Sequence, residues 1–413
     1  MNRFARFAIL AASVMIIGWV GLGHVLGRTA NDKAYKSLVV YSEVLQKVQQ
    51  DYVDEPNMHL VTAGSLHGLL ESLDSESSYL TPREYSEYKQ KTGNSGTGET
   101  GLNLSKRFGY IIVTSVLPDT SAEKAGLHSG DILESVAGFT TREMSVGQAK
   151  NLLAGQPGTG VKVGVIRRGK TQPEEVEIVR EKLPPAKIVA QKVENDTLAL
   201  RFPTLDAGRA EEVRARLLEA QKQGVTKVIL DLRECGRGST AEAIVIARLF
   251  VPSGTLVTLR GQTVPDQVSS ADPTKVVWKG PVTVLMDGTT TGAAEVLAAS
   301  IANTKRGDLV GDRTFGLASE QKLIPMEDGA ALFLTVANYY NAGGKSILEE
   351  GVTPTEVIHA TLNPAEDSEE TDDSATGVQR EPVPGPRPLS QEDPVLRKAL
   401  ELLKNPAPVK KAA

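Results

Sequence analysis

The pattern of apolar and polar positions changes along the chain, and each change predicts a different kind of structure. From Tyr35 to Leu73 apolar residues recur at helical spacing, and Pro56 divides this stretch into two predicted helices. Residues 100–182 instead carry short apolar runs punctuated by glycines, which predicts a small β-rich module. Its predicted strands are Tyr110–Val116, Ile132–Val136, Val161–Arg167 and Glu175–Val179, and its predicted helix is Ser145–Leu153 with Ser145 as the N-cap.

Residues 186–362 alternate apolar strands with amphipathic helices. The predicted strands are Thr197–Phe202, Lys227–Leu232, Val282–Met286, Leu309–Gly311 and Ala330–Tyr340. The predicted helices are Gly208–Lys222, with Leu217 and Leu218 turned inward, Thr240–Phe250 and Ala293–Asn303. This alternation predicts an α/β layer structure with a largely parallel sheet. Sites in such sheets lie beyond the carboxyl ends of strands, here the loops Arg233–Thr240 and Asp287–Ala294.

The first residues have the pattern of a membrane anchor. Phe7 to Gly27 carry no charged side chain, and Arg3 and Arg6 precede them. About 20 apolar residues suffice to span a bilayer core. Because positive flanks stay in the cytoplasm, we expect the rest of the chain to face the periplasm or another extracytoplasmic space. A cleaved signal peptide is the alternative.

The last 50 residues change character again. Pro364–Asp393 is rich in Glu, Asp, Ser and Pro and is predicted to be disordered. The amphipathic helix predicted at Pro394–Leu403 is expected to be at most a weak docking element. The predicted organisation is therefore an anchor or signal (1–30), a helical lead-in (31–91), a β-rich domain (92–185), an α/β domain (186–362) and a tail (363–413).

Composition excludes several classes of function. The formal net charge of −5 does not favour nucleic-acid binding. The single cysteine, Cys235, rules out an internal disulfide framework. The five histidines are scattered without metal-ligand spacing, so we expect neither a metal site nor a cofactor.

Several motifs occur in a fixed order along the chain. They are Tyr52-Val-Asp-Glu55, Ser78-Tyr-Leu-Thr-Pro-Arg-Glu-Tyr85, Pro118-Asp-Thr-Ser-Ala-Glu-Lys-Ala-Gly-Leu-His-Ser-Gly-Asp131, Ile229-Leu-Asp-Leu-Arg233, Thr314-Phe-Gly316 and Gly351-Val-Thr-Pro354. Together they resemble the C-terminal processing (tail-specific) serine peptidases, and the run from Pro118 to Asp131 resembles the PDZ signature. The resemblance covers residues 35–360. It implies an α/β peptidase-like domain, a sheet with packed helices, together with a small β-rich PDZ domain, behind the transmembrane helix and the helical lead-in.

The resemblance also implies which residues would carry catalysis. This family uses a serine nucleophile and a lysine general base, placed three residues before and 22 residues after a glutamate that corresponds to Glu295. Those two positions hold Gly292 and Leu317 here. The family's auxiliary glutamine is kept as Gln321. In the oxyanion loop Gly238 keeps the second glycine of the family's N-N-P-G-G, and Arg237 replaces the first. The chain thus resembles a member that has lost both halves of its catalytic pair, which predicts inactivity by the family mechanism.

Replacement chemistry is a separate hypothesis. Thr291 adjoins the lost serine, with Lys305 and Lys322 as the nearest lysines in sequence, although threonines here could simply satisfy backbone groups at the helix N-terminus. Cys235 is a second candidate nucleophile, or else a buried structural thiol. Arg237 beside Glu234 is either an anion-binding feature or a surface ion pair.

Peptide binding is the function that the resemblance leaves in place. PDZ domains add an extended C-terminus to a sheet edge, and the matching segment here is Thr100, Gly101, Leu102, Asn103 and Leu104, facing Ser145–Leu153. Glu99 takes the position of the usual first glycine and places a negative charge near an incoming carboxylate. Three functions stay open: a pseudoprotease that binds protein C-termini or regulates an active peptidase, an active peptidase with a replacement nucleophile, and a scaffold that self-associates. The expected partners are protein C-termini, the membrane and a further copy or an active peptidase.

Overall fold

The computed structural model describes residues 36–92, 96–107, 109–142, 144–167, 169–183, 186–359 and 393–404. The chain divides into two compact units, residues 1–65 and 66–413. The expected transmembrane segment, residues 7–27, lies outside the described residues. Among the helices that are described, none has the length and apolarity needed to cross a bilayer.

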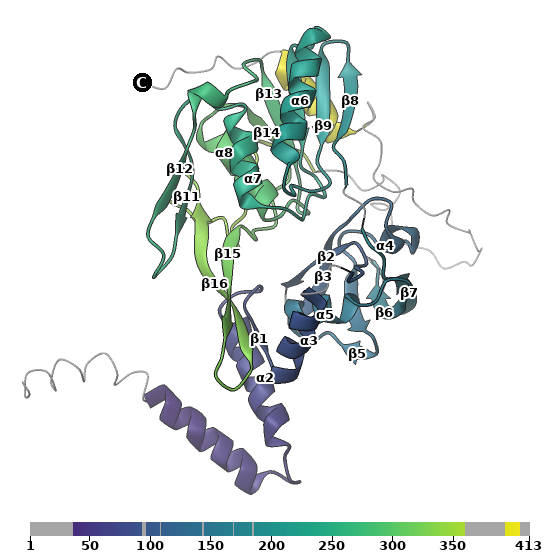
Figure 1. Ribbon diagram of the computed structural model, residues 1–413, viewed down its shortest axis with the longest axis vertical. Helices are drawn as coiled ribbons and strands as arrows, with labels where there is room; N and C mark the ends of the chain where they lie inside the picture. Colours follow the sequence, from purple (N-terminus) through teal and green to yellow (C-terminus); the bar gives the residue numbers. More distant parts are fainter. Residues whose placement is uncertain are drawn as a thin grey trace, which may run out of the picture. The chain divides into compact units, whose positions relative to one another are not determined.

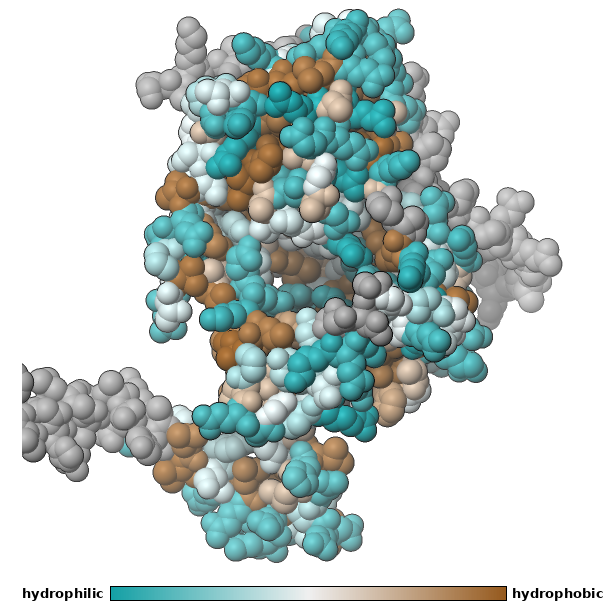
Figure 2. All heavy atoms as spheres, viewed as in Figure 1, coloured by the Kyte–Doolittle hydropathy of each residue, from teal (hydrophilic) through white to brown (hydrophobic). Residues whose placement is uncertain are grey.

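The helical lead-in has the two helices that Pro56 predicts. Residues 36–51 form the first helix, and α2 (Met58–Glu71) is the second. Many of their large apolar side chains are exposed, among them Leu38, Val39, Val40, Val44, Leu60 and Leu69. Apolar and polar side chains are accordingly interspersed on the surface where these helices lie (Figure 2). Helix α3 (Pro82–Thr92) follows the short strand β1 (Ser78–Leu80).

The central sheet of the second unit is the predicted parallel one. Its order is β17-β14-β13-β10-β9-β8, in which every neighbouring pair is parallel except β8 with β9. The strands are β8 (Val189–Glu194), β9 (Thr197–Arg201), β10 (Lys227–Asp231), β13 (Val282–Met286), β14 (Asp308–Gly311) and β17 (Glu356–Val357). Strand and helix positions follow the sequence prediction closely.

Each face of this sheet is covered by different helices (Figure 1). Helices α6 (Arg209–Lys222), α7 (Thr240–Arg248) and α8 (Ala293–Asn303) share one apolar core with Val228, Leu230 and Val284. The alternate residues Ala199, Ile229, Leu285 and Val310 point to the other face, where they pack against α9 (Pro394–Lys404). The inward orientation predicted for Leu217 is confirmed, whereas Leu218 is 43% exposed because it lies beyond the narrow apolar stripe of α6.

The expectation of a weak tail helix is wrong. Helix α9 buries Val395, Leu396, Ala399, Leu400 and Leu403. Full burial of each valine or leucine contributes about 1.5–3 kcal/mol. Among the described residues, α9 is the helix that packs on this face of the sheet, so it belongs to the core. The stretch 364–392, predicted to be disordered, lies outside the described residues, whereas Asp393 is ordered.

A second, five-stranded sheet was not anticipated. Its path is β1-β16-β11-β12, and β15 also pairs with β16. The strands are β11 (Thr255–Arg260), β12 (Gln267–Ser270), β15 (Ser319–Pro325) and β16 (Ala331–Tyr340), and the short η1 (Pro273–Lys275) follows β12. This sheet joins β1 of the lead-in to the strand that follows the Leu317 position.

The β-rich module is a third sheet, of order β2-β3-β4-β6-β7, with β5 paired to β4. Its strands are β2 (Leu102–Arg107), β3 (Tyr110–Val116), β4 (Ile132–Val136), β5 (Phe139–Thr140), β6 (Gly160–Ile166) and β7 (Glu174–Val179). Helix α4 (Ser121–Lys124) and helix α5 (Val146–Leu153) pack on it. Ser145 is the N-cap of α5, as predicted, and it forms a capping box with Gln148.

Candidate functional site

The turn between β13 and α8 contains the position expected for a nucleophile. Gly292 has φ 57° and ψ −114°, a conformation that residues with side chains rarely adopt. A Cβ added there would meet no atom of the described residues within 4 Å. In α/β-hydrolases a strained turn from strand to helix exposes the nucleophile. Gly292 thus has room for a side chain in this turn but carries none.

Glu295 joins this turn to the segment that carries the position of the base. Its carboxylate accepts hydrogen bonds from the Gly292 N–H (2.8 Å), the Leu317 N–H (2.7 Å), the Gly316 N–H (2.6 Å) and the Thr314 hydroxyl (2.5 Å). The side chain is fully buried. Burial raises the pKa of Glu295, and the four donors oppose that shift. One carboxylate thus links the backbone of Gly292 to that of Leu317, the two positions at which the resemblance expects a catalytic pair.

A cation from the β-rich module lies beside the base position. Arg107, at the end of β2, donates a hydrogen bond to the Phe315 carbonyl. Its guanidinium lies 3.9 Å from the centre of the Phe315 ring. Leu317 itself is half-buried. No local pattern predicts this contact, because more than 200 residues separate the two partners.

The loop Glu234–Gly238 lies against the turn. The Thr291 N–H donates to the Cys235 carbonyl over 3.1 Å, and Leu205 pairs with the backbone of Arg237 and Ser239. Gly238 has φ 145°, and a Cβ there would lie 2.5 Å from the Leu205 backbone. Only glycine fits at this position, so the loop retains its close approach to the end of β9.

Arg237 does not pair with Glu234, which corrects the expectation. Its guanidinium contacts Glu99 at 2.8 Å and Asp206 at 3.6 Å. Glu234, which has a positive φ of 61°, is directed instead to Arg201 at 2.6 Å. Because both Arg237 and Glu99 are about half exposed, this is a surface ion pair between the loop and the β-rich module.

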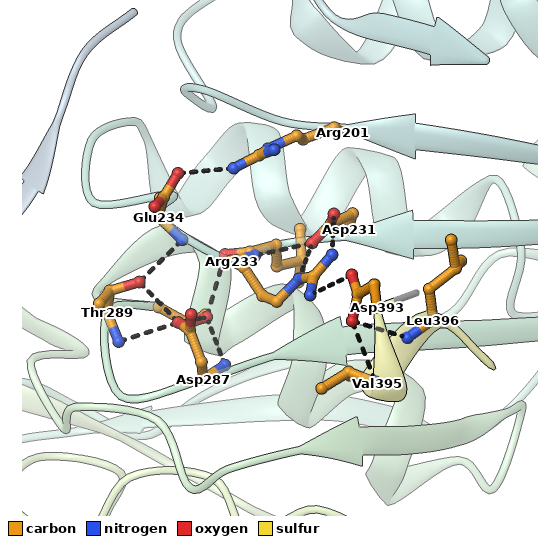
Figure 3. Close-up of polar contacts among 11 residues, drawn as sticks. Arg201, Asp231, Arg233, Glu234, Asp287, Thr289, Asp393, Val395 and Leu396 are labelled. Atoms are coloured by element: carbon orange, nitrogen blue, oxygen red, sulfur yellow. Dashed lines mark hydrogen bonds and ion pairs between the residues drawn. The ribbon is translucent and has the colours of Figure 1, made fainter. Parts of the chain in front are cut away.

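Polar side chains hydrogen-bond to the start of the loop Glu234–Gly238 and to one another (Figure 3). Asp287 accepts from the Thr289 hydroxyl at 2.6 Å, and Thr289 in turn accepts the Glu234 N–H at 2.8 Å. Asp231 receives two hydrogen bonds from the Arg233 guanidinium, both 2.8 Å. These groups lie at the carboxyl ends of β10 and β13, the edge that the sequence singled out.

The replacement nucleophiles are in unfavourable surroundings. Cys235 is 1% exposed, and burial raises the pKa of its thiol to about 12. Thr291 is 3% exposed. Lys305 follows the far end of α8, about 16 Å from Thr291 along an 11-residue helix. Lys322 lies on β15 opposite Leu334. The neighbouring threonines do satisfy backbone groups, but those of the two loops rather than the helix.

Gln321 does not adjoin Leu317. Its side-chain amide donates to the carbonyl of Glu76 at 2.8 Å, in the lead-in. Gly238 and Gln321 are therefore both present at the positions carried over from the resemblance, but only Gly238 lies in the loop beside the turn.

The expected peptide-binding segment begins β2, the terminal strand of its sheet. Thr100 and Leu104 are buried, and Leu102 and Asn103 are half-buried. Gly101 has φ 87°, and a Cβ there would lie 2.5 Å from the Thr120 hydroxyl. The neighbouring helix is α5, as expected. The negative charge of Glu99 is met by Arg237, a neutralisation that the sequence did not reveal.

Comparison with known proteins places these features in a family. The sequence model of peptidase family S41 matches residues 196–358, and that of the PDZ domain matches residues 112–167. The carboxy-terminal-processing protease of Bartonella bacilliformis is 27% identical over 364 residues, covering 87% of this chain and 82% of that protein. The carboxy-terminal processing protease CtpA of Bacillus subtilis is 25% identical over 346 residues, covering 84% and 74%.

A solved structure gives the same result for the fold. The photosystem II D1 C-terminal processing protease superposes with a TM-score of 0.65 at 23% identity, over 80% of this chain and 95% of that chain. The identity is low, so this likeness concerns the fold.

Proposed function

The chain belongs to the carboxy-terminal-processing proteases of peptidase family S41, and from this premise we propose that it is a catalytically inactive member that binds protein C-termini. One observation carries the proposal. Glu295 hydrogen-bonds to the backbone of both Gly292 and Leu317. These are the positions expected for the nucleophile and the base, and neither residue can act as one. Removing either half of such a pair abolishes most of the rate enhancement.

The binding half of the proposal rests on the edge of the PDZ sheet. Strand β2 is terminal and lies beside α5, an arrangement suited to adding a peptide strand. Gly101 allows a tight loop at the start of that edge. Arg237 meets the charge of Glu99, which reduces the repulsion that an incoming carboxylate would meet.

We place the protein outside the cytoplasm, with residues 1–30 as a membrane anchor. This proposal is supported by residues 7–27, which carry no charged side chain and follow Arg3 and Arg6. A scaffold that self-associates is the second candidate, and the exposed apolar side chains of helix 36–51 and α2 favour it.

The test uses the full-length protein in detergent. It is incubated with a library of free C-terminal peptides and with the same peptides amidated, and mass spectrometry reads both retention and cleavage. Peptides with a free carboxylate should be retained uncut. Specific cleavage that is lost in Thr291→Ala or Cys235→Ala would refute inactivity. Failure to retain any peptide, together with concentration-dependent self-association, would support the scaffold instead.

A further inference from the structure

The C-terminal helix and the loop of the candidate site share one carboxylate. Asp393 directly precedes α9, and its Oδ1 accepts the N–H groups of Val395 (3.0 Å) and Leu396 (3.2 Å). Its Oδ2 accepts from the Arg233 guanidinium at 2.7 Å (Figure 3). The same side chain therefore caps the helix and binds the residue that directly precedes the loop Glu234–Gly238.

Arg233 is well placed to transmit this contact. Its guanidinium forms the two bonds to Asp231, which is fully buried, and the third to Asp393. The side chains of Arg233 and Asp393 are only 14% and 18% exposed, so water screens the interaction little. The next residues, Glu234 and Cys235, hydrogen-bond to Thr289 and Leu232. Arg233 is thus the residue through which the loop is attached to both the sheet and α9.

We propose that Asp393 is a positioning residue for the loop Glu234–Gly238. Docking of α9 on the sheet orients Arg233, and Arg233 fixes the start of the loop. The far part of the loop contacts the PDZ domain, since Arg237 pairs with Glu99 and a Cβ on Gly236 would lie 2.4 Å from the Ser115 hydroxyl. The chain's tail and its PDZ edge therefore act on one loop from opposite ends.

Cys235 supplies a readout that does not depend on activity or on peptide binding. It is the only cysteine, it lies inside the loop, and it is 1% exposed, so a thiol reagent reaches it only when the loop opens. Asp393→Asn keeps a good helix cap but removes the charge that Arg233 binds. We expect labelling of Cys235 to become about tenfold faster, equivalent to about 1.4 kcal/mol of easier opening.

The matched control changes another ion pair of the same helix. Lys404, in the last turn of α9, contacts Glu194 at 2.9 Å, away from the loop. Lys404→Gln should leave the labelling rate unchanged, with urea unfolding measured for every variant to exclude global effects. Asp393→Ser, which also caps but is too short to reach Arg233, serves as the second variant and should match Asp393→Asn.

Two results would overturn the proposal. One is an unchanged labelling rate in both Asp393 variants; the other is equal acceleration in Lys404→Gln, which would assign the effect to helix docking in general. Peptide retention measured on the same variants tests the proposed peptide binding separately from the positioning role of Asp393. A protein that retains no peptide, yet shows the labelling pattern, refutes the proposed function and supports the role of Asp393.

Discussion

Replacing Gly292 tests whether the turn still has the geometry of a nucleophile site. Its φ of 57° and ψ of −114° disfavour any side chain, and this strain costs about 1–3 kcal/mol. A new Cβ would overlap no described atom, so no further steric cost is expected. Gly292→Ala and Gly292→Ser should therefore destabilise the protein by about 1–3 kcal/mol each, and equally.

Gly238→Ala is the matched comparison. Gly238 also has a positive φ, of 145°, but a Cβ there would lie 2.5 Å from the Leu205 backbone, so this substitution should cost distinctly more than Gly292→Ala. Urea unfolding followed by the fluorescence of Trp278, which is 2% exposed, measures all three. An equal loss in the free energy of unfolding at the two glycines, or a larger loss at Gly292, would contradict the open space around Gly292.

A second substitution, Leu317→Lys, adds the missing general base to Gly292→Ser. A lysine introduced at Leu317 would lie near Arg107, whose charge disfavours a second cation and so lowers the pKa of the new amine. The double variant Gly292→Ser, Leu317→Lys should hydrolyse C-terminal peptides at least about 10²-fold faster than either single variant. A correctly folded double variant without turnover would refute the view that only two side chains are missing.

Three further predictions concern the frame of the site. Glu295→Gln should destabilise the protein by about 2–5 kcal/mol, because the new side-chain NH2 group would face two of the four buried donors. A loss under about 1 kcal/mol in urea unfolding would contradict the four-donor arrangement. Burial would raise the pKa of Asp231, but the charge and hydrogen bonds of Arg233 outweigh it and hold the pKa below its usual value. The folded-state pKa of Asp231 is thus lower than the unfolded-state pKa of about 4, so the stabilisation from this ion pair is present above about pH 4 and is lost as the pH falls through the folded-state pKa. Asp231→Asn should flatten the acid limb of the stability–pH curve, and an unchanged limb would count against the pair. Leu396→Ala should cost about 2–5 kcal/mol, whereas Leu402→Ala, at a half-buried position on the same helix, should cost clearly less; similar losses would mean that α9 is not docked as described.

Local patterns predicted the elements of the two main domains well, and distance in sequence explains most of what they did not predict. The strands Tyr110–Val116 and Val282–Met286 and the cap Ser145 agree with the structure because their signals are local. The second sheet combines β1 with β16, some 250 residues later, and such pairing leaves no periodic signal.

At the candidate site, too, local motifs were predictable, whereas contacts between residues distant in sequence were not. Motif spacing identified Gly292, Leu317 and Glu295, whose backbone and side-chain contacts then proved to be one frame. The contacts of Arg107 with Phe315 and of Arg237 with Glu99 arise from folding alone. Asp393 did have a local signal, an acidic residue before proline and an apolar helical pattern, but its partner Arg233 is 160 residues away.

Because α9 covers apolar residues on one face of the central sheet, the order of synthesis matters for how this domain matures. Every strand beneath α9, from Thr197 to Gly311, leaves the ribosome before Pro394 does. Until then Ala199, Ile229, Leu285 and Val310 form an uncovered apolar surface on an otherwise assembled sheet. Such surfaces make nascent chains prone to aggregate and bind chaperones. We therefore expect a released chain truncated before residue 393 to be a chaperone client, whereas the released chain that includes residues 393–404 should not be one.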